Sequence, residues 1–176
     1  ESYFAGTLLF REKEPGDTFY VILQGSVKVY IRNEEGKEHI LSVFREGDGL
    51  GELSLIDGKP RSASARTLEA STLLAISRGS FMRLLEGHFS MAATVMAELS
   101  KRLRATNEHV HDLVYHAAHT RVIKNLIQLA NRFGSRTEQR IRVRMPLDRR
   151  ELAQMAGVEE HQLESALRDL ENKRIL

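Results

Sequence analysis

An apolar series with a seven-residue repeat runs through the middle of this 176-residue chain. Its members follow one another at alternating spacings of four and three, and they are Ala92, Met96, Leu99, Leu103, Thr106, Val110, Leu113 and Ala117. This spacing places every member on one face of a long α-helix and is typical of a coiled-coil seam. A seam this regular predicts a partner helix related by twofold symmetry, and therefore a homodimer. The alternative is a helix that packs its apolar stripe on its own domain.

Thr106 interrupts this seam with a hydroxyl. Threonine in a helix readily bonds the carbonyl four residues earlier, which is one interpretation of its presence. The other is that Thr106 and the adjacent Asn107 contact a ligand. The residues alone leave both interpretations open.

Short strands separated by turns are predicted ahead of the helix, over residues 1–80. A two-residue period runs through 19–24, breaks at Gly25 and resumes over 27–31. The remaining expected elements are a hairpin turn at 33–36, a strand through 40–43, a turn at 47–49 and a strand over 72–76. Residues 3–10 already read as a strand, so we expect the chain to enter in mid-fold and further residues to precede Glu1.

A tight turn over residues 51–63 gathers a glycine, a carboxylate, an arginine and a hydroxyl. Gly51 lets backbone N–H groups approach an anion without a Cβ in the way. The planar fork of Arg61 can meet two phosphate oxygens at once. Ionised Glu52 accepts hydrogen bonds and suits a sugar hydroxyl. These groups predict a ribose-phosphate site; the alternative is an ordinary turn with a surface salt bridge between Glu52 and Arg61.

The last third of the chain predicts a helix-turn-helix. The expected elements are a helix over 120–133 ended by Gly134-Ser135, a short strand through Ile141, Val143 and Met145, a helix over 149–156 capped by Asp148, and a helix over 160–172 after a turn at Gly157.

Charge and composition narrow the function classes. Residues 121–150 carry nine basic and two acidic side chains, which indicates a polyanion partner for this half, with a solvated arginine-rich surface as the alternative. Cysteine is absent, which excludes disulfides and thiolate nucleophiles. No apolar stretch is long enough to span a bilayer and no signal peptide opens the chain, so we expect a cytoplasmic protein with no membrane partner.

The cassette over 51–63 and the helix sequence over 102–107 resemble the CRP/FNR (catabolite activator) family of cyclic-nucleotide-responsive bacterial transcription regulators. The resemblance implies an α+β fold with three parts. They are an N-terminal β-roll of the double-stranded β-helix, jelly-roll-like type over 1–80, which binds a cyclic nucleotide, a long dimerisation helix over 81–117, and a winged helix-turn-helix over 118–176. The chain ends at Leu176, before the family's wing strands would finish.

The resemblance also implies a ligand, cyclic AMP, as allosteric effector, with cyclic GMP as the alternative. The residues expected to bind it are Ser42, Gly51, Glu52, Leu53, Arg61, Ser62, Thr106 and Asn107. Thr106 would meet the adenine amino group and Asn107 would reach across from the other subunit, which favours ligand contact over an internal bond. A ligand that binds mainly one dimer arrangement would shift the population toward it.

The DNA-binding half departs from the family. The residues expected to contact DNA are Arg149, Arg150, Glu160, His161, Gln162 and Ser165. Glu159 and Glu160 begin the second helix where the family usually carries a serine cap and then Arg-Glu-Thr, and both base-reading arginines are absent. Each such arginine is worth about 1–3 kcal/mol of discrimination, so we expect a different operator from the family's. At the hinge, Ala117 replaces the aspartate that in the family commonly starts the helix following the long helix, which changes the coupling geometry.

Four histidines, at 109, 111, 116 and 119, cluster near the end of the long helix. His116 and His119 have a spacing that can hold a metal, but we expect no carboxylate or cysteine to complete a site and so predict no metal centre. Nothing pairs a nucleophile with a base, so we predict no enzyme.

The predicted function is a cyclic-AMP-gated, homodimeric, DNA-binding transcription regulator with a non-standard recognition helix. Its expected partners are double-stranded DNA and a second copy of the chain, with RNA polymerase as a further candidate. Two alternatives remain: a nucleotide-binding regulator that has lost sequence-specific DNA binding and acts through protein partners, and a haem-based sensor on the same scaffold.

Overall fold

The computed structural model describes residues 1–137, 141–144 and 146–175. The chain divides into two compact units, Glu1–Arg104 and Ala105–Leu176. Met145, which was expected to end a strand, and Leu176 lie outside the described residues.

Two antiparallel four-stranded sheets form the body of the first unit, in the orders β1-β8-β3-β6 and β2-β7-β4-β5. Their strands are β1 (Ser2–Tyr3), β2 (Leu8–Phe10), β3 (Thr18–Gln24), β4 (Ser26–Arg32), β5 (Glu38–Arg45), β6 (Gly49–Leu50), β7 (Ser64–Thr67) and β8 (Ser71–Ser77). Strand β3 pairs with β8 along almost its full length, and β4 lies between β5 and β7. This arrangement confirms the predicted β-roll.

The period-2 pattern explains why these strands form a core. Ile22, Val27 and Leu73 come from different strands and are at most 1 % exposed, and Leu50 and Ala65 pack in the same cluster. Burial of such side chains is the main stabilising term for a sheet that faces another sheet.

The predicted break between β3 and β4 falls at Gly25. Its φ of 92° lies in the left-handed region, and a Cβ there would come within 2.3 Å of the Ser71 hydroxyl oxygen. Only glycine fits this conformation and this space.

The strand expected over 3–10 is two strands in different sheets. Strand β1 pairs with β8 and β2 pairs with β7, and a turn through Gly6, whose φ is 78°, connects them. The chain therefore crosses from one sheet to the other within a few residues. The sequence pattern also missed β7, because Ser64–Thr67 is short and mostly small or polar.

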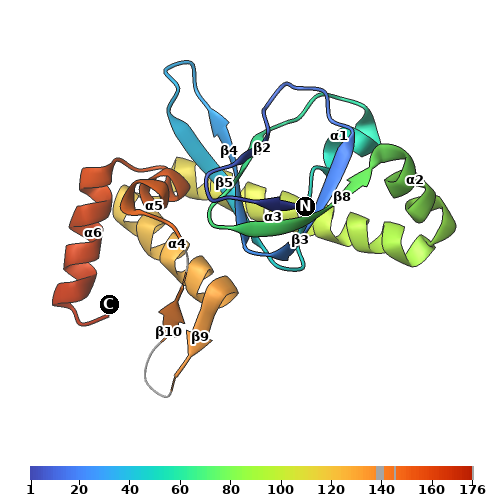
Figure 1. Cartoon of the computed structure of the whole chain (residues 1–176). Coiled ribbons are helices and arrows are strands. Elements are labelled where there is room, and N and C mark those ends of the chain that lie inside the picture. The colour runs from blue at the N-terminus through green and yellow to red at the C-terminus, as the bar shows by residue number, and fades with distance from the viewer. Residues whose placement is uncertain (138–140, 145, 176) are drawn as a thin grey trace. The chain divides into compact units, whose positions relative to one another are not determined.

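Three helices belong wholly or partly to the first unit: α1 (Glu52–Asp57), α2 (Arg78–Gly87) and α3 (Phe89–Tyr115). Helices α1 and α2 contact each other beside the sheets (Figure 1). The helical segment expected over 81–117 is divided at His88, whose backbone is extended and follows the poor helix former Gly87. Helix α3 runs on from the first unit into the second.

The second unit contains the end of α3, then α4 (Ala118–Phe133), β9 (Gly134–Arg136), β10 (Ile141–Val143), α5 (Arg149–Ala156) and α6 (Glu160–Asn172). Helices α4, α5 and α6 pack together around Val122, Ala153 and Leu163, each at most 2 % exposed (Figure 1). Asp148 caps α5 in a reciprocal capping box with Glu151. The predicted helix-turn-helix is confirmed, and with it the α+β fold class.

Arg121 connects three backbone segments of this unit. Its guanidinium donates to the carbonyl of His116 in the bend after α3 at 2.9 Å, and to the carbonyls of Ala156 and Gly157 in the turn after α5 at 3.1 and 2.8 Å. Gly157 has a φ of 62°, which is the usual glycine conformation at a helix end. Because Ala117 stands at its N-cap position, α4 begins without a side-chain cap, and Arg121 links its first turn to the bend.

No helix among the described residues has both the length and the apolar character needed to cross a membrane.

Candidate functional site

The cassette over 51–63 begins at a glycine that the geometry requires. Gly51 has a φ of 92° and immediately precedes α1, whose start has no side-chain cap. A Cβ at this position would lie 2.7 Å from Nη1 of Arg61 and 3.0 Å from the carbonyl oxygen of Thr18. Glycine therefore allows the Arg61 guanidinium to lie close to the backbone at this position.

Arg61 is turned into the fold and is 5 % exposed. Its Nη1 donates to the carbonyl of Gly51 and its Nη2 to the carbonyl of Thr18, both at 2.7 Å. Its guanidinium carbon lies 4.2 Å from the centre of the Phe10 ring. Burial lowers the pKa of Arg61, and nearby Tyr20 and the carboxylates partly oppose this, so the group stays charged. Its Nε is buried and has no hydrogen-bond partner among the described residues.

Glu52 is the second buried charge of the cassette, at 6 % exposed. Its Oε1 accepts a hydrogen bond of 2.8 Å from Nη1 of Arg102 on α3, and Nη2 of Arg102 donates to the carbonyl of Gly49 at 2.6 Å. Its Oε2 has no partner among the described residues. The alternative of a surface salt bridge between Glu52 and Arg61 is wrong, because both groups are buried and Glu52 pairs with Arg102.

Arg102 contacts the cassette in a way that the sequence did not reveal. Its guanidinium also lies 4.7 Å from the centre of the Phe44 ring. It therefore ties α3 to the cassette and to the second sheet at one point. The contact joins residues fifty positions apart, and no local spacing encodes it.

The remaining predicted ligands differ in accessibility. Leu53 is 45 % exposed at the first turn of α1, and Ser62 is exposed beside Arg61. Ser42 is half-buried on β5, opposite Val29 of β4. Thr106 and Asn107 are exposed on α3 and belong to the second unit. Within the first unit the structure thus brings Arg61 close to Gly51 and Glu52, and Ser62 follows Arg61 in the chain.

A cavity of about 440 Å³ lies against the same segment. Its walls are mostly apolar and come from β3, β8, α2 and the first half of α3, including Phe19, Phe81 and Leu99. Glu52 and Arg102 also line it, whereas Arg61 and Ser62 do not. The cavity is therefore distinct from the position where the phosphate was expected.

Comparison with known proteins gives one match within the first unit and others along nearly the whole chain. A family profile described as "Cyclic nucleotide-binding domain" matches residues 1–88. The chain is 33 % identical over 168 residues to the "CRP-like cAMP-activated global transcriptional regulator" of Mycobacterium tuberculosis, covering 96 % of this chain and 75 % of the relative. It is 31 % identical to the "cAMP-activated global transcriptional regulator CRP" of Escherichia coli, covering 99 % and 83 %.

The chain belongs to the CRP/FNR family. The solved structures agree on the fold of that family. FixK2 from Bradyrhizobium japonicum has a TM-score of 0.87 at 22 % identity, covering 100 % of this chain and 85 % of that one. The c-di-GMP-responsive regulator CLP from Xanthomonas campestris has a TM-score of 0.80 at 26 % identity, covering 98 % and 86 %. The two curated relatives are described as transcriptional regulators, a class of protein that does not catalyse a reaction and that agrees with the predicted function.

Part of the helix-turn-helix surface is engaged inside the CRP/FNR fold. Arg149 forms an ion pair with Glu164 of α6. The side-chain carbonyl of Gln162 accepts the backbone N–H of Glu159 at 3.0 Å and so helps to cap α6. Four further predicted contact residues are exposed, and they are Arg150, Glu160, His161 and Ser165.

The expectation that no carboxylate lies near the histidines is wrong. Asp112 is buried on α3, and its Oδ1 lies 3.6 Å from Nε2 of His116 and 3.8 Å from Nδ1 of His111. Lys124 of α4 donates to the same Oδ1 at 2.5 Å. The spacing of four between Asp112 and His116 was the sequence signal for this contact, because such residues share a helix face. His119 pairs with Asp169 instead.

Proposed function

We propose that the chain is a cyclic-AMP-gated, homodimeric transcription regulator that binds double-stranded DNA in the cytoplasm. One observation carries the proposal: the buried cassette holds an unsatisfied donor, Nε of Arg61, and an unsatisfied acceptor, Oε2 of Glu52. Buried polar groups without partners are uncommon in proteins, and each needs an explanation. A phosphate oxygen suits the first atom and a ribose hydroxyl suits the second. A ribose cyclic phosphate carries both.

The roles of the residues follow from this assignment. Arg61 and the exposed hydroxyl of Ser62 hold the cyclic phosphate, and backbone groups at Gly51 and Leu53 approach it. Glu52 holds the ribose, and Ser42 makes a lesser contact. Thr106 and Asn107 meet the base. Cyclic AMP is the favoured nucleotide because curated relatives are described as cAMP-activated, and cyclic GMP is the second candidate.

Arg102 supplies a route from the nucleotide to α3. Its hydrogen bond to Glu52 is direct, so any shift of that carboxylate toward a ribose changes the partner of a residue on the long helix. A ligand with different affinity for two arrangements of α3 shifts the population between them. The structure supports this step through one contact within the first unit.

The apolar seam on α3 supports the dimer. Met96, Leu103, Val110 and Leu113 are 53, 62, 53 and 40 % exposed, although all are apolar. Leu99 instead lines the cavity beside the cassette, so this member of the seam packs against its own unit. Exposed apolar residues repeated along one helix are typical of an interface with a partner helix. Sedimentation equilibrium should give twice the chain mass; a monomer at micromolar concentration would contradict the proposal.

Nucleotide binding is tested by calorimetry and by thermal unfolding with cyclic AMP, cyclic GMP and 5′-AMP. A ligand selective for the native state adds about 2.7 kcal/mol at a free concentration one hundred times its Kd. We expect stabilisation by cyclic AMP, a smaller effect of 5′-AMP, and no stabilisation of the Arg61→Ala variant. Because that change also removes internal hydrogen bonds, Glu52→Gln serves as a second variant. It keeps the shape and loses the anionic acceptor.

Glu46→Gln is the matched control, because Glu46 is exposed and lies outside the cassette. It should respond to cyclic AMP like the unmodified protein. An unchanged response of both cassette variants, or no response of the unmodified chain, would exclude the cassette as the site.

A second candidate function is regulation through protein partners after loss of sequence-specific DNA binding. The specific observation in its favour is that Arg149 and Gln162 are already engaged with Glu164 and Glu159, while Glu160 adds negative charge where DNA would lie. Selection from a random duplex library, with and without cyclic AMP, separates the two. Enrichment of a motif supports DNA reading, and RNA polymerase is then a candidate partner. An unenriched pool in both conditions supports the protein-directed function.

A further inference from the structure

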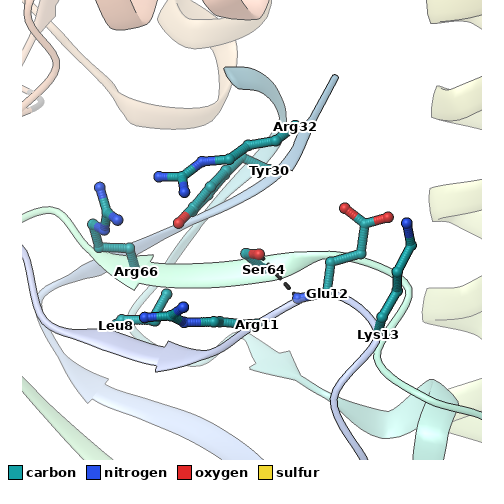
Figure 2. Close-up of a pocket in the computed structure, with 8 residues that line it drawn as sticks. All are labelled: Leu8, Arg11, Glu12, Lys13, Tyr30, Arg32, Ser64 and Arg66. Carbon is teal, nitrogen blue, oxygen red and sulfur yellow. Dashed lines mark hydrogen bonds between the residues drawn. The ribbon is translucent and has the colours of Figure 1, made fainter. Parts of the chain in front are cut away.

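A second cavity, of about 290 Å³, opens on the first unit among β2, β4 and β7. The residues that line it lie outside the cassette, and three of them are arginines: Arg11, Arg32 and Arg66. Figure 2 shows their guanidinium groups on the same side of the pocket as the hydroxyl of Tyr30. The site therefore concentrates positive charge at one end.

One carboxylate, that of Glu38, lies close to two of these arginines and to Lys28. Glu38 lies 2.6 Å from Nη2 of Arg32, 3.7 Å from Nη1 of Arg66 and 3.2 Å from Nζ of Lys28. Arg11 is exposed and has no acidic partner for its guanidinium among the described residues. Without counting Lys28, the three arginines and Glu38 together carry a net charge of two positive units. A ligand with two negative charges would complete this balance.

Hydrogen-bond donors are in excess at the same place. The Ser64 hydroxyl oxygen accepts the backbone N–H of Glu12 at 3.0 Å, the bond drawn in Figure 2, which leaves its proton to donate to a ligand. Nε of Arg66 is buried and has no partner among the described residues. A carboxylate offers two acceptor oxygens, whereas a terminal phosphate offers three.

The two other charged residues of the pocket do not cancel this field. In Figure 2 the side chains of Glu12 and Lys13 extend toward the opposite end, away from the three guanidinium groups. The volume of about 290 Å³ lies just below the range of about 300–1,000 Å³ that is usual for ligand pockets, so only a small ligand fits.

We propose that this cavity binds the terminal phosphate of a small molecule through Arg11, Arg32, Arg66 and Ser64. Guanidinium groups form paired, charge-assisted hydrogen bonds with phosphate oxygens, which a surface lysine does not reproduce. A terminal phosphate carries about two negative charges at neutral pH, whereas a cyclic phosphodiester carries one. The site therefore discriminates against the ligand proposed for the cassette.

Isothermal titration at constant ionic strength, in a phosphate-free buffer, tests the proposal with inorganic phosphate and glucose 6-phosphate. We expect saturable binding of one equivalent. Tighter binding of inorganic phosphate identifies free phosphate as the source, and tighter binding of the sugar ester identifies a phosphomonoester. Loss of one guanidinium in Arg11→Gln should weaken binding about tenfold, because a charge-assisted pair is lost. Arg66→Lys, which keeps the charge and loses the fork, should also weaken it.

Lys13→Gln is the matched control, since Lys13 lines the same cavity but extends away from the arginines. It should change the affinity by less than about twofold, as expected of an exposed charge. Equal losses in Arg11→Gln and Lys13→Gln, or no binding of either probe, would overturn the proposal. Binding that Arg61→Lys abolishes and Arg11→Gln leaves intact would place the phosphate in the cassette, and would also count against this site.

Discussion

The buried guanidinium of Arg61 leads to a stability prediction that needs no ligand. Arg61→Ala removes two hydrogen bonds of 2.7 Å to the carbonyls of Gly51 and Thr18 and the contact with Phe10. Hydrogen bonds to charged groups contribute about 1.5–3 kcal/mol each. A desolvated cation over an aromatic ring adds about 1–2 kcal/mol. Part of this gain is offset by the cost of burying the charge, which the variant no longer bears.

The expected net result is a loss of about 2–4 kcal/mol in the free energy of unfolding of the unliganded protein. For a domain of about 100 residues, such as the first unit, each kcal/mol lowers the Tm by about 4–8 °C, so the melting temperature of this unit should fall by at least about 8 °C. Urea unfolding followed by far-UV circular dichroism measures the difference. Arg61→Lys keeps the charge but provides a single point donor, so an intermediate loss is expected.

Arg83→Ala is the control, because Arg83 is an exposed arginine of the same unit. Its effect should stay within about 0.5 kcal/mol. The reasoning is refuted if Arg61→Ala is as stable as this control, since the two carbonyl bonds would then contribute nothing in solution.

Three further predictions concern other parts of the fold. Gly51→Ala should destabilise the first unit by at least about 1 kcal/mol, because of its positive φ and the Cβ contacts at 2.7 and 3.0 Å, and urea unfolding should show it; wild-type stability would contradict the clash. Burial works to raise the pKa of Asp112, but the hydrogen bond from Lys124 and the charges of Lys124 and His116 lower this pKa overall. Asp112 therefore stabilises the fold above about pH 4, and this stabilisation is lost as the pH falls through the depressed pKa. Between about pH 5 and pH 3 the unmodified chain should therefore lose more unfolding free energy than Asp112→Asn, and equal losses would argue against the pairing. Asp148→Ala should lower the free energy of unfolding by about 1 kcal/mol in the same assay, because the cap of α5 is lost. Asp148→Asn should keep most of the stability that the cap provides, and equal losses in the two variants would show that the cap is not the cause.

The sequence predicted those features that local patterns encode. The two-residue period located β3 and β4, and Gly25 marked the break between them because only glycine adopts its conformation in that space. The predicted cap at Asp148 and the turn at Gly157 located α5 and the start of α6. The spacing of the cassette singled out Gly51 and Arg61, which the structure shows in contact, and their roles toward a ligand stay predictions.

Features that depend on contacts between distant segments were missed. Strand β7 has no apolar alternation, and it forms because β2 and β4 pair with its two edges. Arg102 bonds Glu52 across fifty residues, so neither residue predicts the other. The inward turn of Arg61 depends on the carbonyl of Thr18, which a different strand supplies. The cluster at Asp112 differs, because its contact with His116 spans one helical turn and could have been found.

Arg121 has a mechanical consequence. Because one planar side chain holds the carbonyl of His116 and those of Ala156 and Gly157, the bend after α3 and the turn between α5 and α6 cannot separate without breaking charge-assisted bonds. A displacement of the end of α3 would therefore also move the turn between α5 and α6. Shortening this one side chain would leave both helices folded and yet uncouple the motion of one from the orientation of the other.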